Sequence, residues 1–286
     1  MWFTAQRTGR LGWLDPKTGQ TKMIPLGPGS APHGVIVGPD RAAWVTDGGL
    51  NAILRVDERT NEITRYPLPA SVPRVDLNTA AIASGPTVGR VWFTGQAGFL
   101  GLLEITPQGA ATVKVIPAPR GSGPYGITVR PGVEYEAYYA SLAGSHIGRV
   151  SICCVNGGYS IDAEAIEPPT KDQGARRVWS DSKGIIWVSE WNAGQLGRYD
   201  PRTSQWKEWK LPGARPQAYA VFVDDRDIVW LTDWGASAIV RLDPATETFT
   251  SFPHAPNGEI RQLNGRPGEV WGALSALDKL LLVTTR

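Results

Sequence analysis

The chain has 286 residues, with 33 glycines, 23 prolines and 12 tryptophans, a composition typical of a folded protein built from short strands and many turns. The 29 basic and 27 acidic residues nearly balance and form no basic run, so we expect no nucleic-acid partner. No segment comes close to the roughly 18 consecutive apolar residues of a membrane span, so we expect no membrane partner either.

A short strand-like run recurs along the whole chain, with 41 to 49 residues between successive copies. In chain order the copies read WFTA from Trp2, WVTD from Trp44, WFTG from Trp92, YYAS from Tyr138, WVSE from Trp187, WLTD from Trp230 and WGAL from Trp271. Such even spacing over the full length indicates a repeat architecture.

Three further strands are expected around each copy. A run that often contains proline precedes it, as in APHGVIV from Ala31, GPYGITV from Gly123 and RPQAYAV from Arg215. A third run follows, such as RLGWLDP from Arg10, and a fourth ends at proline, as in KMIPL from Lys22. Four strands in about 40 residues are typical of one blade of a β-propeller.

The sequence therefore predicts an all-β fold, a seven-bladed β-propeller of four-stranded antiparallel blades, in a single domain over residues 1–286. The tryptophan of each second strand is expected to pack between blades, where its large ring buries apolar area. The first repeat begins at its second strand and the last ends after its third, so we expect the terminal blade to be incomplete.

The two ends of the chain also bear on the cellular compartment in which the protein is expected. The chain opens MWFTAQRTGR, without the apolar segment of a secretory signal, which as given favours the cytoplasm. The missing strands suggest the hypothesis that the natural chain starts upstream with a signal peptide. The protein would then be periplasmic or secreted.

Three segments, Pro124-Tyr125-Gly126-Ile127, Trp187-Val188-Ser189-Glu190 and Ile147-Gly148-Arg149, resemble the repeat of the streptogramin B (virginiamycin B) lyase family. The resemblance extends over nearly the whole chain. It implies a seven-bladed propeller with a divalent metal, usually magnesium, near the axis. It also implies a histidine base that removes a substrate proton, after which a depsipeptide ester opens by elimination rather than hydrolysis.

The functional residues of that family carry over only in part. Where the family has Ala-Arg-Pro-His, this chain has Ala214-Arg215-Pro216-Gln217. Where the family has Glu-Pro-His in the last blade, this chain has Glu259-Ile260-Arg261. The second metal-binding glutamate of the family falls near Leu274-Ser275. Glu259 is thus retained, and the histidine base is replaced.

The propeller geometry gives a second route to the site, because ligands bind where the loops of a scaffold converge. The residues that begin the inner strands and end the second strands would line the top of the central channel, and nearly all are polar. By repeat position they are His33, Asn78, Tyr125, Arg176, Gln217 and Arg261 on inner strands, and Asp47, Gln96, Ser141, Glu190 and Asp233 on second strands.

From these positions and their neighbours we predict three sets of site residues. The catalytic set is His33, Arg176, Arg261 and Glu190. The substrate-binding set is Asn78, Gln96, Tyr125, Gln217, Tyr219, Trp191 and Trp234. The metal-binding set is Glu259, Asp233 and Asp47, whose oxygens suit Mg²⁺ or Ca²⁺.

Each set has a structural alternative. His33 is either a general base or a hydrogen-bonded channel residue. Arg176 and Arg261 could hold an anionic substrate, either a carboxylate or an enolate-like anion. The alternative is that they form ion pairs with Glu190, Asp233 or Glu259. The carboxylates are otherwise hydrogen-bond acceptors, and the aromatic residues otherwise pack the blades. The two remaining histidines, His146 and His254, are expected at the surface.

Three functions remain open at this point. The first is a lyase-like enzyme that breaks a C–O bond in an ester or lactone, with the usual His/Glu set largely replaced, His33 as base and the arginine pair holding an anion. The second is a calcium-dependent hydrolase of the gluconolactonase type, with Glu190, Asn78 and Asp233 as ligands. The third is a non-catalytic binding propeller. The expected partner is a small molecule, anionic or a cyclic ester, and the chain is expected to be a monomer.

Overall fold

The computed structural model describes residues 1–286 except 71, 73–76, 84–88, 107, 134, 156–157 and 286, and it describes strand residues 77–83, 154–155 and 158–159 by their backbone alone. The chain divides into two compact units. The first comprises Met1–Ala137 and Val150–Ala163, and the second comprises Tyr138–Arg149 and Glu164–Arg286. The single domain over residues 1–286 stays a prediction.

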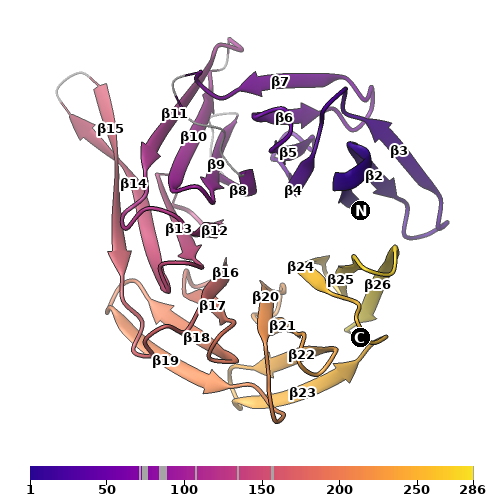
Figure 1. The fold of residues 1–286 in the computed structure, drawn as a ribbon, viewed down its shortest axis with the longest axis vertical. Coiled ribbons are helices and arrows are strands. Elements are labelled where there is room, and N and C mark those ends of the chain that lie inside the picture. The colour runs from indigo at the N-terminus through magenta and orange to yellow at the C-terminus, as the bar shows by residue number, and fades with distance from the viewer. Residues whose placement is uncertain are drawn as a thin grey trace. The chain divides into compact units, whose positions relative to one another are not determined.

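The described residues form seven antiparallel sheets, and Figure 1 labels their strands except β1. The first three sheets are β1 (Trp2–Ala5), β2 (Arg10–Leu14) and β3 (Thr21–Pro25); β4 (Pro32–Val37), β5 (Ala43–Asp47), β6 (Ala52–Val56) and β7 (Ile63–Pro67); and β8 (Leu77–Ala83), β9 (Arg90–Gly95), β10 (Phe99–Ile105) and β11 (Ala111–Pro117).

The other four sheets follow in the same order along the chain. They are β12 (Pro124–Val129), β13 (Glu136–Ser141), β14 (His146–Val155) and β15 (Gly158–Ile166); β16 (Ala175–Ser180), β17 (Ile186–Glu190), β18 (Gln195–Asp200) and β19 (Gln205–Lys210); β20 (Ala218–Val223), β21 (Val229–Asp233), β22 (Ala238–Asp243) and β23 (Thr248–Pro253); and β24 (Ile260–Arg266), β25 (Glu269–Leu274) and β26 (Lys279–Thr284).

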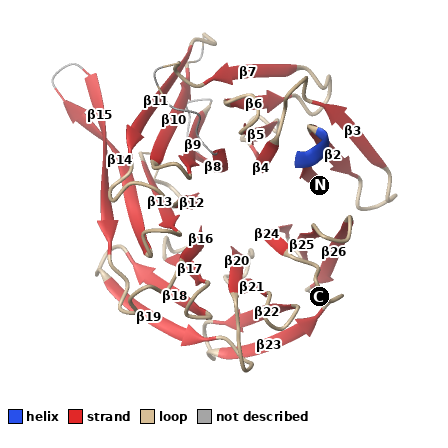
Figure 2. Ribbon diagram, viewed as in Figure 1, coloured by secondary structure: helices blue, strands red, loops and turns tan. Residues whose placement is uncertain are grey.

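The fold class is the one that the repeat predicts, an all-β seven-bladed propeller. Five of the described sheets have four strands, and the first and the last have three, which agrees with the expected incomplete repeats. Figure 2 shows strands joined by turns and loops; in the described part of the chain the one helical segment is a 3-10 turn, η1 (Gln6–Thr8). Within that part, no helix is long and apolar enough to cross a membrane.

The second strand of each complete repeat is buried along all or nearly all of its length. All five residues of β5, β17 and β21 are buried, whereas the outer strands β7 and β23 are largely exposed or half-buried. A strand that is covered on both faces cannot alternate apolar and polar residues freely. Its polar side chains must therefore find hydrogen-bond partners, and two of the repeated residue types do so in a fixed way.

The repeated tryptophan is a packing residue, as predicted. Trp187 is 1% exposed and packs with apolar residues of β20 and β21 in the next sheet. Its indole Nε1 donates a hydrogen bond of 3.0 Å to Asp181, in the turn that precedes β17. Trp230 and Asp224 form the same 3.0 Å bond one repeat later. The aspartate thus provides a hydrogen-bond acceptor for the indole N–H, which would otherwise be buried without a partner.

The repeated Thr or Ser two residues after the tryptophan links neighbouring strands. Ser189 Oγ accepts a hydrogen bond from the backbone N–H of Arg177 (3.0 Å), where the register between β16 and β17 shifts and the ladder leaves that N–H unpaired. The same hydroxyl donates to the carbonyl oxygen of Tyr219 on β20, at 2.5 Å. Both bonds recur one repeat later, from Ala220 to Thr232 and from Thr232 to Ile260. These bonds hold the starts of the inner strands in place.

Candidate functional site

Residues at equivalent repeat positions meet in the second unit. Its inner strands β16, β20 and β24 are neighbours, and Arg176, Tyr219 and Arg261 each occupy the second position of their strand. Trp191 and Trp234 directly follow the second strands β17 and β21. All five residues were predicted as site residues from the repeat, and the structure brings them together.

The three aromatic rings form a compact group. Tyr219 and Trp234 are stacked, with ring centres 4.6 Å apart and an angle of 12° between the planes. Trp191 meets both rings edge to face, at 5.6 Å from Tyr219 and 5.3 Å from Trp234. Trp234 is also fixed by a 3.0 Å hydrogen bond from its Nε1 to the carbonyl oxygen of Ile260. Tyr219 is buried, and the two tryptophans are half-buried.

Two guanidinium groups lie against these rings. The Cζ atom of Arg176 is 4.4 Å from the ring centre of Trp191 and 4.2 Å from that of Tyr219. The Cζ atom of Arg261 is 5.0 Å from the ring centre of Trp234 and 5.8 Å from that of Tyr219. These distances are those of cation–π contacts. We call the five residues Arg176, Trp191, Tyr219, Trp234 and Arg261 the aromatic–arginine cluster.

The two arginines differ in their charge partners. Arg261 Nη2 donates a 2.7 Å hydrogen bond to Glu259, whose backbone has a positive φ of 49°, a strained conformation for a residue other than glycine. Burial opposes the charge on Arg261, but the Tyr219 phenol and the Glu259 carboxylate outweigh it and raise the pKa of the guanidinium. Arg176 has no acidic partner within the described residues, and its buried Nε makes no hydrogen bond there.

Glu190, predicted to be catalytic, is fully buried. Its Oε2 accepts a 2.5 Å hydrogen bond from Gln195 Nε2, and among the described residues its Oε1 has no hydrogen-bond partner. Burial raises the pKa of this carboxyl to about 8, against the hydrogen bond from Gln195. The side chain is therefore protonated at neutral pH and lies out of reach of solvent. Gln195 was missed by the sequence reasoning, although its place opposite Glu190 follows from the hairpin register.

The aspartates at the ends of the second strands hold turns. Asp233 Oδ1 accepts hydrogen bonds from the backbone N–H groups of Gln217 (2.8 Å) and Gly235 (2.9 Å). In the first unit, Asp47 Oδ1 accepts from two backbone N–H groups, and its Oδ2 accepts a 2.5 Å bond from the Ser30 hydroxyl. Both carboxylates have no exposed surface. An aspartate that accepts from backbone groups in this way stabilises the turn itself.

The predicted metal set does not fit a metal ion as the side chains are placed. A magnesium or calcium site needs several oxygen donors that converge on one point. Within the described part of the chain, no three His, Cys, Asp or Glu side chains form such a group. Asp47 and Asp233 hold turns, and Glu259 is paired with Arg261. The donor set Glu259, Asp233 and Asp47 is therefore not supported, and we derive no step through a metal.

The remaining predicted residues are spread over the two units. In the first unit, the half-buried ring of His33 meets the buried ring of Tyr125 edge to face at 6.2 Å, and Gln96 is half-buried. The side chain of Asn78 lies outside the described residues. In the second unit, Gln217 is exposed and contributes its backbone N–H to the turn of Asp233.

One expectation about a histidine was wrong. His146, expected at the surface, is fully buried, and its Nδ1 lies 3.0 Å from the carbonyl oxygen of Gly144. Its ring meets that of Tyr139 edge to face at 6.0 Å, so it belongs to the packing of the repeat. His254 is half-buried, with its Nδ1 2.9 Å from the carbonyl oxygen of Ala255.

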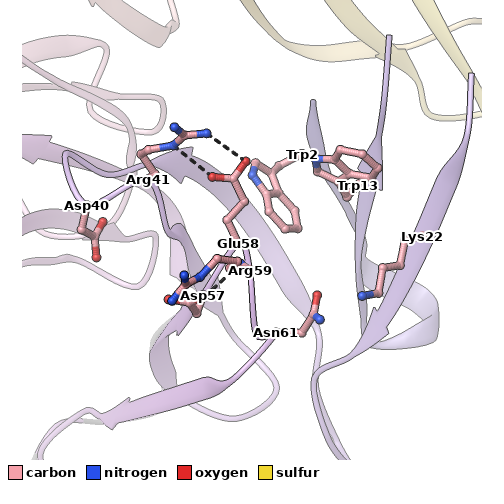
Figure 3. A pocket seen from close by; sticks show the side chains of 9 residues that line it. All are labelled: Trp2, Trp13, Lys22, Asp40, Arg41, Asp57, Glu58, Arg59 and Asn61. Atoms are coloured by element: carbon pink, nitrogen blue, oxygen red, sulfur yellow. Dashed lines mark hydrogen bonds and ion pairs between the residues drawn. The ribbon is translucent and has the colours of Figure 1, made fainter. Parts of the chain in front are cut away.

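A cavity of about 610 Å³ lies within the first unit, lined by the nine residues drawn in Figure 3. Arg41 and Glu58 form an exposed ion pair at its edge, at 3.1 Å. The carboxylate of Asp40 accepts hydrogen bonds from Trp44 and Arg55, which leaves it little capacity for a ligand. None of the nine lining residues belongs to the predicted sets, so the aromatic–arginine cluster remains the candidate site.

Seven sheets of three or four antiparallel strands define the class of seven-bladed β-propeller proteins. Comparison with known sequences then gives the family. The pattern of the Virginiamycin B lyase family matches residues 1–179, more than half of the chain, and the chain belongs to this family. Four of the five cluster residues lie beyond the matched segment.

Solved structures agree with the fold. A structure of streptogramin B lyase is 24% identical, covers 99% of this chain and 89% of its own, and superposes with a TM-score of 0.81. A catalytically inactive virginiamycin B lyase from Staphylococcus aureus with quinupristin is 23% identical, covers 91% of this chain and 83% of its own, and has a TM-score of 0.76. No curated protein matches the chain in sequence.

Proposed function

We propose that this chain is a C–O lyase that opens an ester or lactone in a small molecule by elimination, with arginine in place of part of the usual His/Glu set. One observation carries the proposal: a member of the lyase family holds two guanidinium groups against a partly exposed aromatic surface. A flat organic molecule suits such a surface, and an oxygen that becomes negative suits the guanidiniums.

The reaction develops charge on the oxygen that leaves. A base removes a proton from the carbon next to a carbonyl group, and the electron pair of that C–H bond forms a new C=C bond. The C–O bond at the neighbouring carbon breaks, and its electron pair leaves with the oxygen as a carboxylate. No water is consumed. Guanidinium N–H groups are strong donors to such an oxygen, so they stabilise the transition state more than the neutral ester.

Arg261 suits this role. By the resemblance it stands where the family has its histidine base, but a guanidinium keeps its proton at every relevant pH and cannot act as a base. Its side chain is 48% exposed, and Glu259 accepts a hydrogen bond from only one of its nitrogens. Tyr219 also has a side-chain hydrogen bond with Arg261, and the N–H groups that neither residue engages can face a departing carboxylate. Its contribution is therefore electrostatic.

For the base, we keep His33 as a proposal from its repeat position. Its side chain is half-buried, and an unperturbed imidazole titrates close to neutral pH. Its backbone carbonyl accepts a 2.8 Å hydrogen bond from the Thr4 hydroxyl, which fixes the strand that carries it. Tyr125 limits the positions of the ring from one side.

The proposal is tested by the mass of the product. The purified chain is incubated with quinupristin, with neutral lactones and with esters that carry a carboxylate, and the products are analysed by mass spectrometry. Elimination opens a ring without changing its mass, whereas hydrolysis adds one water. A ring-opened product of unchanged mass supports the proposal. Products that have all gained water favour a hydrolase of the lactonase type, and turnover of none of these compounds favours a binding protein; either result overturns the lyase.

A further inference from the structure

Arg176 has no counter-ion among the described residues. Six arginines of the second unit pair with a carboxylate within 4.0 Å, namely Arg149, Arg202, Arg226, Arg241, Arg261 and Arg266. Arg176 has no such partner among the described residues, although it is half-buried. Its Nε is buried and makes no hydrogen bond there. Among the described residues, the contacts of the guanidinium are those with the rings of Trp191 and Tyr219.

The half-buried guanidinium of Arg176 lacks an anion or a hydrogen-bond acceptor that would offset its burial. Removing a guanidinium from water costs free energy, which a paired anion or hydrogen bonds normally offset. The two aromatic faces offset part of that cost but accept no hydrogen bonds from the edge of the group. Nearby Glu190 is no substitute, because its carboxyl is protonated at neutral pH and fully buried. An anion supplied by a ligand would complete the site.

We propose that Arg176 binds a carboxylate group that the substrate carries before the reaction begins. This inference rests on the proposed function and names its substrate class: esters or lactones that bear a free carboxylate. The two arginines then have different tasks. Arg176 anchors the permanent negative charge, and Arg261 stabilises the charge that develops on the departing oxygen.

The geometry favours a planar carboxylate over other anions. The rings of Trp191 and Tyr219 both contact the Arg176 guanidinium but are nearly perpendicular to each other, at 85°, so they do not both stack on its faces. Because the rings accept no hydrogen bonds in the plane of the guanidinium, the N–H groups at its edge need another partner. A carboxylate meets such an edge with two parallel hydrogen bonds in one plane. Trp234, which is half-buried and stacked on the buried ring of Tyr219, can contact a flat apolar group next to the carboxylate. Benzoate has both features and serves as a probe that cannot react.

Binding is measured by isothermal titration calorimetry at constant ionic strength, with benzoate, its neutral analogue benzamide, and sulfate. We expect benzoate to bind at least tenfold more tightly than either. Arg176→Gln should weaken benzoate binding by about tenfold to a hundredfold, as expected for loss of a hydrogen-bonded charge partner. Arg202→Gln, which removes an exposed arginine of the same unit, is the matched control and should leave the affinity unchanged. Circular dichroism verifies that each variant is folded.

Three results would overturn the inference: equal affinity for benzoate and benzamide, equal affinity for sulfate, or equal losses in Arg176→Gln and Arg202→Gln. Its failure is distinct from that of the lyase. Benzoate binding that depends on Arg176, with no ester eliminated, leaves this inference standing and removes the reaction. Elimination of carboxylate-bearing esters at the same rate and KM by Arg176→Gln and the wild type keeps the reaction and removes this inference.

Discussion

The buried carboxyl of Glu190 allows a quantitative prediction about stability. Glu190 has no exposed surface, and burial raises its pKa from 4.5 to about 8. In the unfolded chain the same group is exposed and returns to its ordinary pKa. Between these two values the folded protein binds one proton more than the unfolded chain, so the free energy of unfolding decreases as the pH rises.

The size of this decrease follows from linkage. One proton contributes about 1.4 kcal/mol per pH unit across the window between the two pKa values. The total from pH 4.5 to about 8 is on the order of 5 kcal/mol. The stabilisation is fully present below the lower value and is lost as the pH passes the upper one. Exposed carboxyls whose pKa is lowered, such as Asp15 and Asp57, act in the opposite direction at more acidic pH.

The test is urea unfolding of the wild type and of Glu190→Gln at several pH values from 5 to 9. The amide oxygen of the variant can still accept the hydrogen bond from Gln195, but the side chain has no proton to lose. We expect similar stability at pH 5 and a more stable variant at pH 9, by several kcal/mol. Glu62→Gln, at a partly exposed carboxylate of the first unit, is the control and should follow the wild type. Parallel curves for the wild type and Glu190→Gln from pH 5 to 9 would refute the reasoning.

Three further predictions concern the fold, the base and the metal. Ser189→Ala should lower the free energy of unfolding by about 1–3 kcal/mol in urea titrations, because the N–H of Arg177 and the carbonyl of Tyr219 lose their partner; an unchanged midpoint would contradict this. His33→Asn should reduce kcat by about a hundredfold or more if His33 is the base, and a kcat within twofold of the wild type would remove it from that role. Because the predicted donors hold turns or pair with Arg261, EDTA should leave the melting temperature unchanged, and a clear drop that magnesium or calcium restores would show a metal site.

The repeat made the fold predictable, because burial on both faces of the second strand requires the same residue types in every sheet. The tryptophan of the second strand can be recognised in the sequence by its regular spacing. The role of Ser189 was not predicted, because the hydrogen-bond partners of its hydroxyl depend on long-range structure. One partner is left unpaired by a register shift between β16 and β17, and the other is a carbonyl oxygen in the next sheet. Such long-range partners have no local sequence signal.

The site was predictable in position more than in chemistry. Arg176 and Arg261 occupy the second position of their inner strands, as the spacing indicated, but the sequence placed Gln217 at the equivalent position of β20 and was wrong there. Tyr219 holds that position, and Gln217 directly precedes β20. The same reasoning placed Glu190 and Asp233 among reactive residues, but their carboxylates point into the protein and are fully buried. Which way a strand-end side chain turns depends on the turn that follows, and a repeat alone does not determine it.

The most direct test of the account is the rate of ester opening by the wild type and by Arg261→Gln, with the product followed by mass. The account predicts a ring-opened product of unchanged mass from the wild type, and a kcat lower by about a hundredfold in the variant, as for loss of one donor to a developing oxyanion. A product that has gained water, or a variant as fast as the wild type, would contradict it.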